Sequence, residues 1–156
     1  MANVNHSSLT DPYIHEPKGA ATAAAGSVYV ANGSGSVAWT ATETLVGETL
    51  SGYIEDVSAV ETVHVPVPYA GTISKVITVL EGAIGSADST ITVKNSSAVS
   101  MGTLTIAHLG SAAGDVDTLS PSSNNAVTSD SFITVSSDGA STTQAKLRFT
   151  IVLDRS

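Results

Sequence analysis

The chain has 156 residues, enough for one domain with an appended segment, and it is dominated by Ala, Val, Gly, Ser and Thr with only 4% aromatic residues. This composition favours an all-β protein with a core of small side chains. The net charge of −8 and the six basic residues argue against binding to DNA or RNA, and the absence of cysteine excludes disulfides, thiolate catalysis and cysteine-ligated zinc.

Residues 1–50 are rich in glycine, alanine and proline and predict an extended N-terminal arm. Pro12 and Pro17 bracket a short extended piece, because a residue that precedes proline is pushed towards β or polyproline geometry. Further on, two strands are predicted, Ser27–Ala31 and Val37–Thr42, joined by the turn signal Asn32-Gly33-Ser34-Gly35. A short β-hairpin is therefore expected in the arm, with a flexible linker as the alternative interpretation.

Residues 51–156 alternate between strand-like segments and clusters of turn residues, which is typical of a β-sandwich or barrel. Pro66 and Pro68 cannot donate to a β-ladder, so their segment is expected to be an edge strand or a strand end. Strict alternation over Gly71–Leu80 would place Ile73 on the same face as Lys75 and Ile77. The predicted strands are Tyr53–Val57, Val60–Val67, Gly71–Leu80, Ser89–Lys94, Gly102–Leu109, Asp115–Leu119, Ser131–Ser136 and a last one from Ala145 to Leu153.

The sequence shows no pattern that predicts an enzyme, a metal site or a cofactor. Asp115 and Asp117, with Asp130 and Asp138 further along, could supply calcium ligands, but Asp in short loops more often bonds the local backbone. The histidines are scattered without the spacing of a ligand pair; they are His6, His15, His64 and His108. No nucleophile elbow or phosphate loop has the required structural context.

Five of the seven aromatic residues lie before residue 70, and they are Tyr13, Tyr29, Trp39, Tyr53 and Tyr69. Exposed Tyr and Trp side chains can anchor a protein interface or stack against sugars. Alternatively, Tyr29 and Trp39 cover a small local core. All three interpretations stay open on the sequence alone.

Two stretches of the sequence resemble known proteins. The first is Tyr13-Ile14-His15-Glu16-Pro17-Lys18-Gly19 together with Gly26-Ser27-Val28-Tyr29-Val30-Ala31-Asn32-Gly33, and it resembles N-terminal segments of small virion proteins of tailed bacteriophages. The second, Val65-Pro66-Val67-Pro68-Tyr69-Ala70-Gly71-Thr72-Ile73-Ser74-Lys75-Val76 with Gly110-Ser111-Ala112-Ala113-Gly114-Asp115-Val116-Asp117, is similar to phage head decoration or head-fibre proteins. This resemblance implies a capsid decoration (cement) protein, often trimeric, with a jelly-roll β-sandwich.

On this basis we expect residues 1–50 to bind the major capsid protein and residues 51–156 to form a self-associating sandwich, in a homotrimer on the outer capsid surface of the virion. The expected capsid contacts are Tyr13, His15, Glu16, Pro17, Lys18, Tyr29 and Trp39. Neither a secretory signal nor an apolar run of about 20 residues is visible, so synthesis in the host cytoplasm and no membrane partner are expected. The alternative is a fibre or glycan-binding module that uses exposed aromatics and the loops Ser120–Asn125 and Asp138–Thr143.

Overall fold

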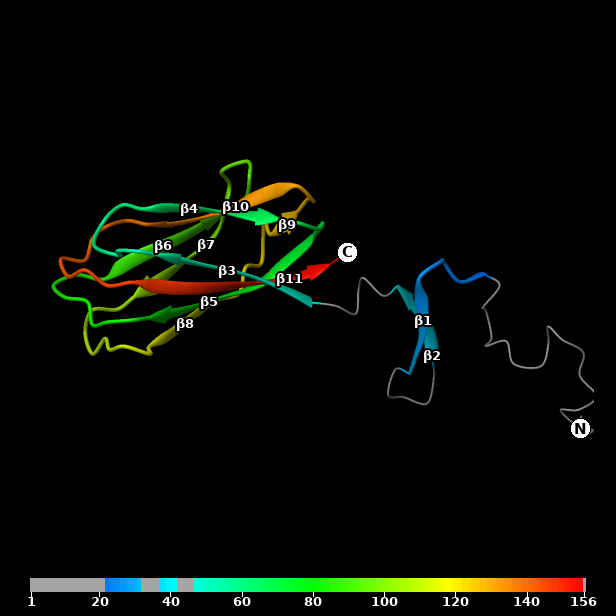
Figure 1. Cartoon of the computed structure of the whole chain (residues 1–156), viewed down its shortest axis with the longest axis horizontal. Helices are drawn as coiled ribbons and strands as arrows, with labels where there is room; N and C mark the ends of the chain where they lie inside the picture. The colour runs from blue at the N-terminus through cyan, green and yellow to red at the C-terminus, as the bar shows by residue number, and fades with distance from the viewer. Residues whose placement is uncertain (1–21, 32–36, 42–46, 156) are drawn as a thin grey trace, which may run out of the picture. The chain divides into compact units, whose positions relative to one another are not determined.

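The computed structural model describes residues 22–31, 37–41 and 47–155 (Figure 1). The chain divides into two compact units, Met1–Leu45 and Val46–Ser156. The regular structure of the described ranges is antiparallel β, and no α-helix occurs within them. The all-β class expected from the composition is confirmed.

The described part of the first unit contains a β-hairpin. Strand β1 (Ser27–Ala31) pairs antiparallel with β2 (Val37–Ala41), and Tyr29 lies opposite Trp39. Both strands begin where the sequence predicted them. The turn signal between them and the residues beyond Ala41 lie outside the described ranges.

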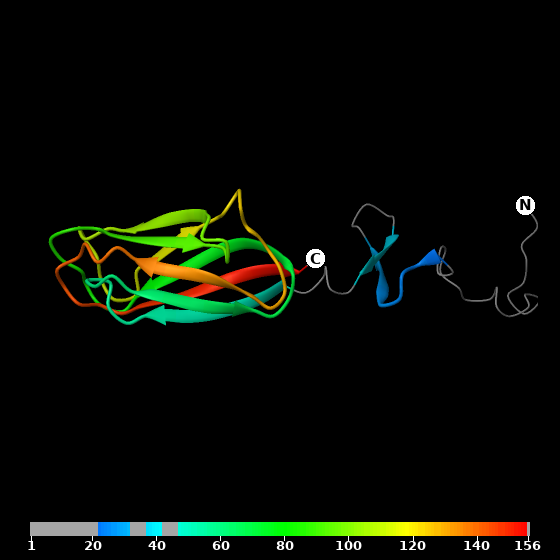
Figure 2. The same ribbon diagram turned by 90° about the horizontal axis from the view of Figure 1, so that it is seen from above.

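The second unit contains two antiparallel sheets that pack face to face, as in a β-sandwich (Figures 1 and 2). One sheet has the order β4-β10-β6-β7 and the other has the order β3-β11-β5-β8, with the short β9 also paired to β5. We refer to this unit as the sandwich. Its strands are β3 (Gly47–Ile54), β4 (Thr62–Val67), β5 (Gly71–Leu80), β6 (Ser89–Lys94), β7 (Ser100–Ile106), β8 (Val116–Leu119), β9 (Ala126–Val127), β10 (Ser131–Ser137) and β11 (Leu147–Arg155).

The strand pairing in the sandwich is nested along the chain. With the two-residue β9 set aside, the first strand β3 pairs with the last strand β11, and β4 pairs with β10. Inside these pairs, β5 pairs with β8, and the innermost strands β6 and β7 pair with each other. Such nesting is what a single long hairpin produces when its doubled ribbon is folded over into two layers.

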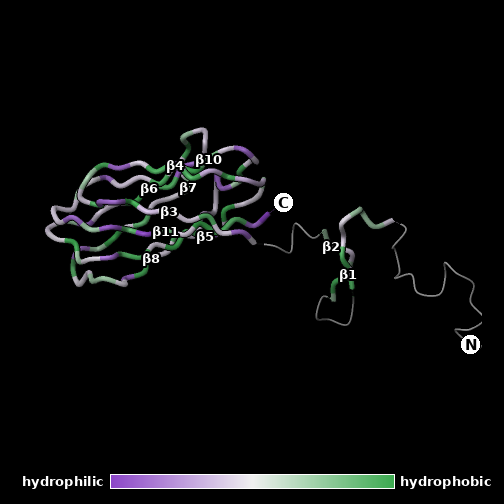
Figure 3. Tube along the Cα trace, viewed as in Figure 1, coloured by the Kyte–Doolittle hydropathy of each residue, from purple (hydrophilic) through white to green (hydrophobic). Residues whose placement is uncertain are grey.

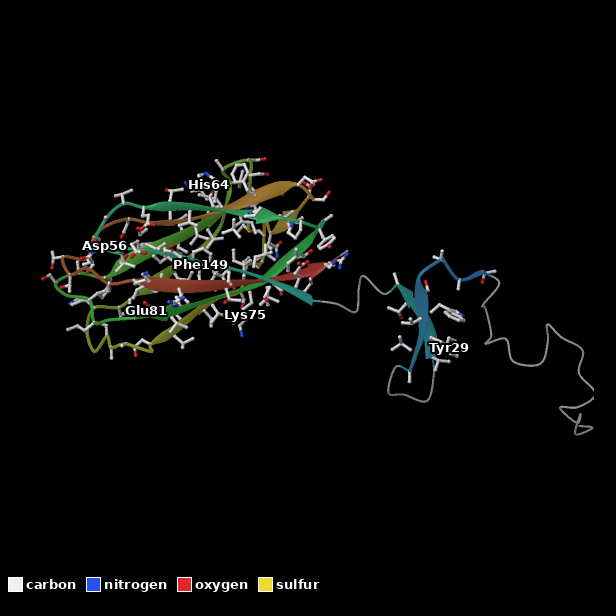
Figure 4. All side chains as sticks on the ribbon, in the orientation of Figure 1. Tyr29, Asp56, His64, Lys75, Glu81 and Phe149 are labelled. Carbon is white, nitrogen blue, oxygen red and sulfur yellow. The ribbon has the colours of Figure 1, made fainter. Side chains whose placement is uncertain are left out.

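The core lies between the two sheets and consists mainly of Ile, Val and Leu side chains. Hydrophobic and hydrophilic residues alternate along the strands (Figure 3), so each strand turns one set of side chains inward. Phe149 of β11 is the largest fully buried side chain and points between the sheets (Figure 4). Burying these aliphatic surfaces is the main stabilising contribution available to a protein without disulfides.

Several strands differ from the predicted bounds by a few residues, among them β4, β7 and β11, and three further differences affect the packing. Strand β3 begins at Gly47 and pairs with β11 along its whole length, so residues 47–50 belong to a sheet of the sandwich although the prediction assigned them to the arm. Strand β5 has a register shift opposite Val152 and Leu153, which places Ile73 in the core while Ile77 faces outward. The two-residue strand β9 was not predicted.

Candidate functional site

The aromatic pair of the hairpin is the part of the predicted capsid-binding site that the structure describes. The rings of Tyr29 and Trp39 lie on directly opposite residues, with their centroids 4.9 Å apart and their planes tilted by 44°. Tyr29 is 40% exposed, and Figure 4 shows its ring standing out from β1. Tyr13, His15, Glu16, Pro17 and Lys18, the other predicted contacts, lie outside the described residues.

The hairpin keeps its apolar side chains largely in solvent. Val28 and Val37 are also exposed, and no described residue of β1 or β2 is fully buried. A two-stranded ribbon is marginally stable on its own in water, so its apolar surface favours a partner. The tilted pair is compatible with a small local contact and with an anchor on another protein, two of the interpretations that the sequence left open.

The outer face of the sheet β3-β11-β5-β8 carries exposed and half-exposed aliphatic side chains. The register aligns Arg148, Val79 and Val116 in one row, and it aligns Thr150, Ile77 and Thr118 in the next. A third row adds Val152 and Lys75. We call this surface the aliphatic face, defined by Ile77, Val79, Val116 and Val152.

Paired charges border the aliphatic face at one end. Lys146 forms an ion pair with Glu55 at 3.0 Å and lies 4.6 Å from the ring centroid of Tyr53, while Arg148 pairs with Glu81. The hydrogen bond to Glu55 raises the pKa of the Lys146 ammonium, so this charge persists at any neutral pH. The face thus combines apolar side chains with nearly balanced charge in a chain whose net charge is −8.

The opposite outer face, on β4, β10 and β6, contains a groove of about 330 Å³. Hydroxyl groups of Thr and Ser dominate it, together with one imidazole, one ammonium and one phenyl ring. We call it the hydroxyl groove, and it is lined by Thr62, His64, Lys94, Asn95, Ser96, Ala98, Phe132, Thr134 and Ser136. His64 lies on this side of the sandwich and Lys75 on the other (Figure 4).

Two of the aspartates that the sequence suggested as calcium ligands accept hydrogen bonds from backbone amides in their own turns. Asp115 accepts a hydrogen bond from the Ala112 amide at 2.7 Å, and Asp138 accepts one from the Ala140 amide at 3.1 Å. Over the described ranges, no three acidic or histidine side chains gather in a way that could hold a metal ion. His108 instead binds Asp88, whose pKa is lowered by hydrogen bonds from the His108 backbone and ring.

The two loops proposed for a glycan site lie at opposite ends of the sandwich. Asn125 of the first loop exchanges hydrogen bonds with Ile73 near the start of β5. The second loop bonds Gly85 through Thr142, beyond the far end of β5. They cannot form one binding site, because the intervening strand separates them.

The comparisons with known proteins leave this chain unassigned. No protein-family model matches it, and no curated protein matches it significantly. No helix in the described residues is both long enough and apolar enough to cross a membrane. Fold and surface therefore define the class of the protein, an all-β protein with a β-sandwich-like unit and a separate unit that carries a hairpin.

Proposed function

We propose that this chain is a structural virion protein, a decoration (cement) protein that binds the outer surface of a tailed-phage capsid and acts without catalysis. The observation that supports the proposal most strongly is the difference in burial between the two units. The sandwich has a complete core of its own, whereas the hairpin leaves Tyr29 and two valines exposed and only half-buries Trp39. The resemblance of residues 13–33 and 65–76 to phage virion proteins supports the same conclusion.

In this proposal the N-terminal unit contacts the major capsid protein. Tyr and Trp are enriched at protein interfaces because a large apolar ring is combined with a polar handle. Tyr29 and Trp39 stand side by side and supply such an anchor, and the predicted contacts Tyr13, His15, Glu16, Pro17 and Lys18 belong to the same unit. Binding only to the assembled shell stabilises that shell by mass action.

We further propose that the sandwich is a jelly roll. The nested pairing of β3 with β11, β4 with β10, β5 with β8 and β6 with β7 supports this topology. A jelly roll consists of eight strands in two sheets, which matches the count once the short β9 is set aside.

The aliphatic face is the surface on which we expect the sandwiches to self-associate as a homotrimer. Ile77, Val79 and Val152 are only half-buried there, and Val116 is 59% exposed. The charges beside these residues balance closely, so association through this face avoids the repulsion that a net charge of −8 produces elsewhere. Many weak contacts of this kind gain from the high local concentration on a symmetric shell.

The test is binding of purified protein to undecorated tailed-phage capsids, measured by co-sedimentation. A double variant, Tyr29→Ser with Trp39→Ser, is expected to lose binding, as is a chain lacking residues 1–40. The matched control is Tyr69→Ser, because Tyr69 is a tyrosine of the sandwich that is 43% exposed and does not belong to the rows of the aliphatic face. Undiminished binding of the double variant and of the shortened chain would refute the role of the N-terminal unit.

A further inference from the structure

The hydroxyl groove has the composition of a binding site rather than of an ordinary sheet surface. Thr134 lies at its centre, directly opposite His64 on β4 and opposite Lys94 on β6. Neighbouring strands are about 4.8 Å apart, so an imidazole, a hydroxyl and an ammonium follow one another in a row across three strands. Thr62 and Ser136 form the next row and add two hydroxyls.

One wall of the groove is a loop held in a fixed shape. The Asn95 side-chain oxygen accepts hydrogen bonds from the amides of Ser97 and Val99, both at 3.1 Å. The Asn95 amide group donates to the carbonyl of Asn124, and Asn124 in turn donates to the carbonyl of Ser100. The wall therefore keeps its position without a ligand, which reduces the entropy that binding would cost.

The charged group of the groove is not ion-paired within the described structure, whereas the Ser136 hydroxyl donates a long hydrogen bond of 3.5 Å to the Thr92 carbonyl. Lys146 and Arg148 each pair with a glutamate, but Lys94 forms no ion pair with any described residue. None of the residues that line the groove is acidic, although the chain has 14 Asp and Glu residues. The groove thus presents a free ammonium beside hydroxyl groups.

Phe132 provides an apolar surface at the end of the groove next to His64. It is 39% exposed, and the His64 ring meets it edge-on with centroids 5.2 Å apart, which holds the phenyl ring in place. Phe132 lies two residues from Thr134 on the same face of β10, within the diagonal reach of Lys94. A ligand of this groove therefore needs an apolar face, several hydroxyls and a negative charge.

We propose that the hydroxyl groove binds an acidic saccharide. One sugar ring packs on Phe132, its hydroxyls exchange hydrogen bonds with Thr62, Thr134 and Ser136, and its carboxylate pairs with Lys94. A free phosphate fits less well, because phosphate sites use clustered backbone amides, and the wall amides of Ser97 and Val99 are taken by Asn95. The site lies on the sheet opposite the aliphatic face and in a different unit from the hairpin, so it stands independently of the proposed capsid contacts.

The experiment is an NMR titration of the full chain with oligosaccharides of galacturonate, glucuronate and N-acetylneuraminate, with neutral galactose oligomers and inorganic phosphate as separate arms. At least one acidic saccharide is expected to shift the amide signals of Lys94 and Thr134. Lys94→Met is expected to weaken its affinity about tenfold or more, as loss of a charge-assisted hydrogen bond does. Lys75→Met removes a lysine of the opposite sheet that forms no ion pair with any described residue, and it should leave the affinity unchanged.

A second pair of variants tests the phenyl ring. Phe132→Ser should abolish the shifts, whereas Phe132→Tyr keeps an aromatic surface and should retain them. The proposal is overturned if no acidic saccharide shifts the groove signals at millimolar concentration, if Lys75→Met weakens binding as much as Lys94→Met, or if neutral sugars or phosphate bind equally well. Loss of saccharide binding with intact capsid binding would separate this site from the proposed function.

Discussion

Gly52 shows how one residue can fix the packing of a sheet edge. It faces Phe149 across the pair of β3 and β11, and the phenyl ring occupies the space that a side chain would need. A Cβ atom at Gly52 would come within 2.5 Å of the ring. The largest core side chain therefore depends on a glycine in the neighbouring edge strand.

Gly52→Ala is expected to lower the free energy of unfolding by about 1–3 kcal/mol, because the added methyl group displaces Phe149 within a close-packed core. The matched control is Gly47→Ala in the same strand, where the nearest atom to a Cβ lies 3.8 Å away and no strain arises. Chemical denaturation of both variants measures the difference. Equal stability of the two variants would contradict the packing argument.

Asp117 gives the sandwich a pH-dependent element. Partial burial, together with the nearby charge of Asp115, raises the pKa of its carboxyl group. The folded state thus holds this proton more tightly than the unfolded state does, so the charged form costs stability as pH rises through the raised pKa. Asp117→Asn should raise the melting temperature near neutral pH and leave it unchanged well below the ordinary pKa of aspartate.

The comparison residue for Asp117 is Asp88, whose pKa is shifted downward by its hydrogen bonds with His108. Its charge adds stability above its unfolded pKa, so Asp88→Asn should lower the melting temperature near neutral pH. Thermal scans at neutral and acidic pH decide both cases. Effects of the same sign in the two variants at neutral pH would contradict the assignment.

At the scale of elements, the bulge in β5 decides which side chains meet the core. The register passes from Lys75 opposite Val152 to Ile73 opposite Leu153, so one residue of β5 is left over. Ile73 and Val76 are therefore both buried, although they are three residues apart. Residues that precede the bulge therefore face the side of the sheet opposite to the one that strict alternation predicts from the residues after it.

The aliphatic face, to which β5 contributes Ile77 and Val79, is tested by Ile77→Asp. If the sandwiches associate through it, the added charge should shift the protein towards monomer in sedimentation-velocity experiments, because a carboxylate in an apolar interface is costly to bury. Thr105→Asp on β7 makes a comparable charge change on the other sheet and should leave the association state unchanged. A monomeric wild-type chain at all concentrations, or the same effect from both variants, would refute this interface.

The sequence predicted nearly every strand of the sandwich, including the weakly alternating β8 and β10, and missed only the two-residue β9. Strands β5 and β6 have the predicted bounds, and the Pro66 strand lies at a sheet edge as expected. The predicted start of strand β3 was too late in the sequence, because Gly47 and Gly52 are typical of a turn-rich segment. The reason for Gly52 lies in the structure, where the Phe149 ring occupies the space of a side chain. The bulge left no recognisable mark in the sequence.

The hairpin could be predicted from adjacent residues, but the hydroxyl groove could not. Its side chains come from β4, β10, β6 and the loop that follows β6, and these segments meet only through the strand order. A lone lysine and scattered threonines carry no local signal. The pairing of Thr134 with both His64 and Lys94 is a property of tertiary structure.

At the scale of the whole molecule, the two units differ in what they bury. The buried hydrophobic side chains of the described residues all lie between Ile54 and Leu153. Removal of residues 1–45 should therefore leave the melting temperature of the sandwich nearly unchanged in calorimetry. Removal of residues 1–52 deletes most of β3 and should lower it strongly, so similar melting temperatures for the two truncations would contradict the boundary.

The pairing of the first strand of the sandwich with the last also has a mechanical consequence. Gly47 lies opposite Asp154, so the chain enters and leaves the sandwich at the same end, on adjacent antiparallel strands. A force applied between these two points would break the hydrogen bonds of β3 and β11 one after another, as in opening a zipper, rather than load them together in shear. The sandwich therefore resists little force when it is pulled between Gly47 and Asp154. When it is tethered only through its N-terminal side, no force acts between these two positions.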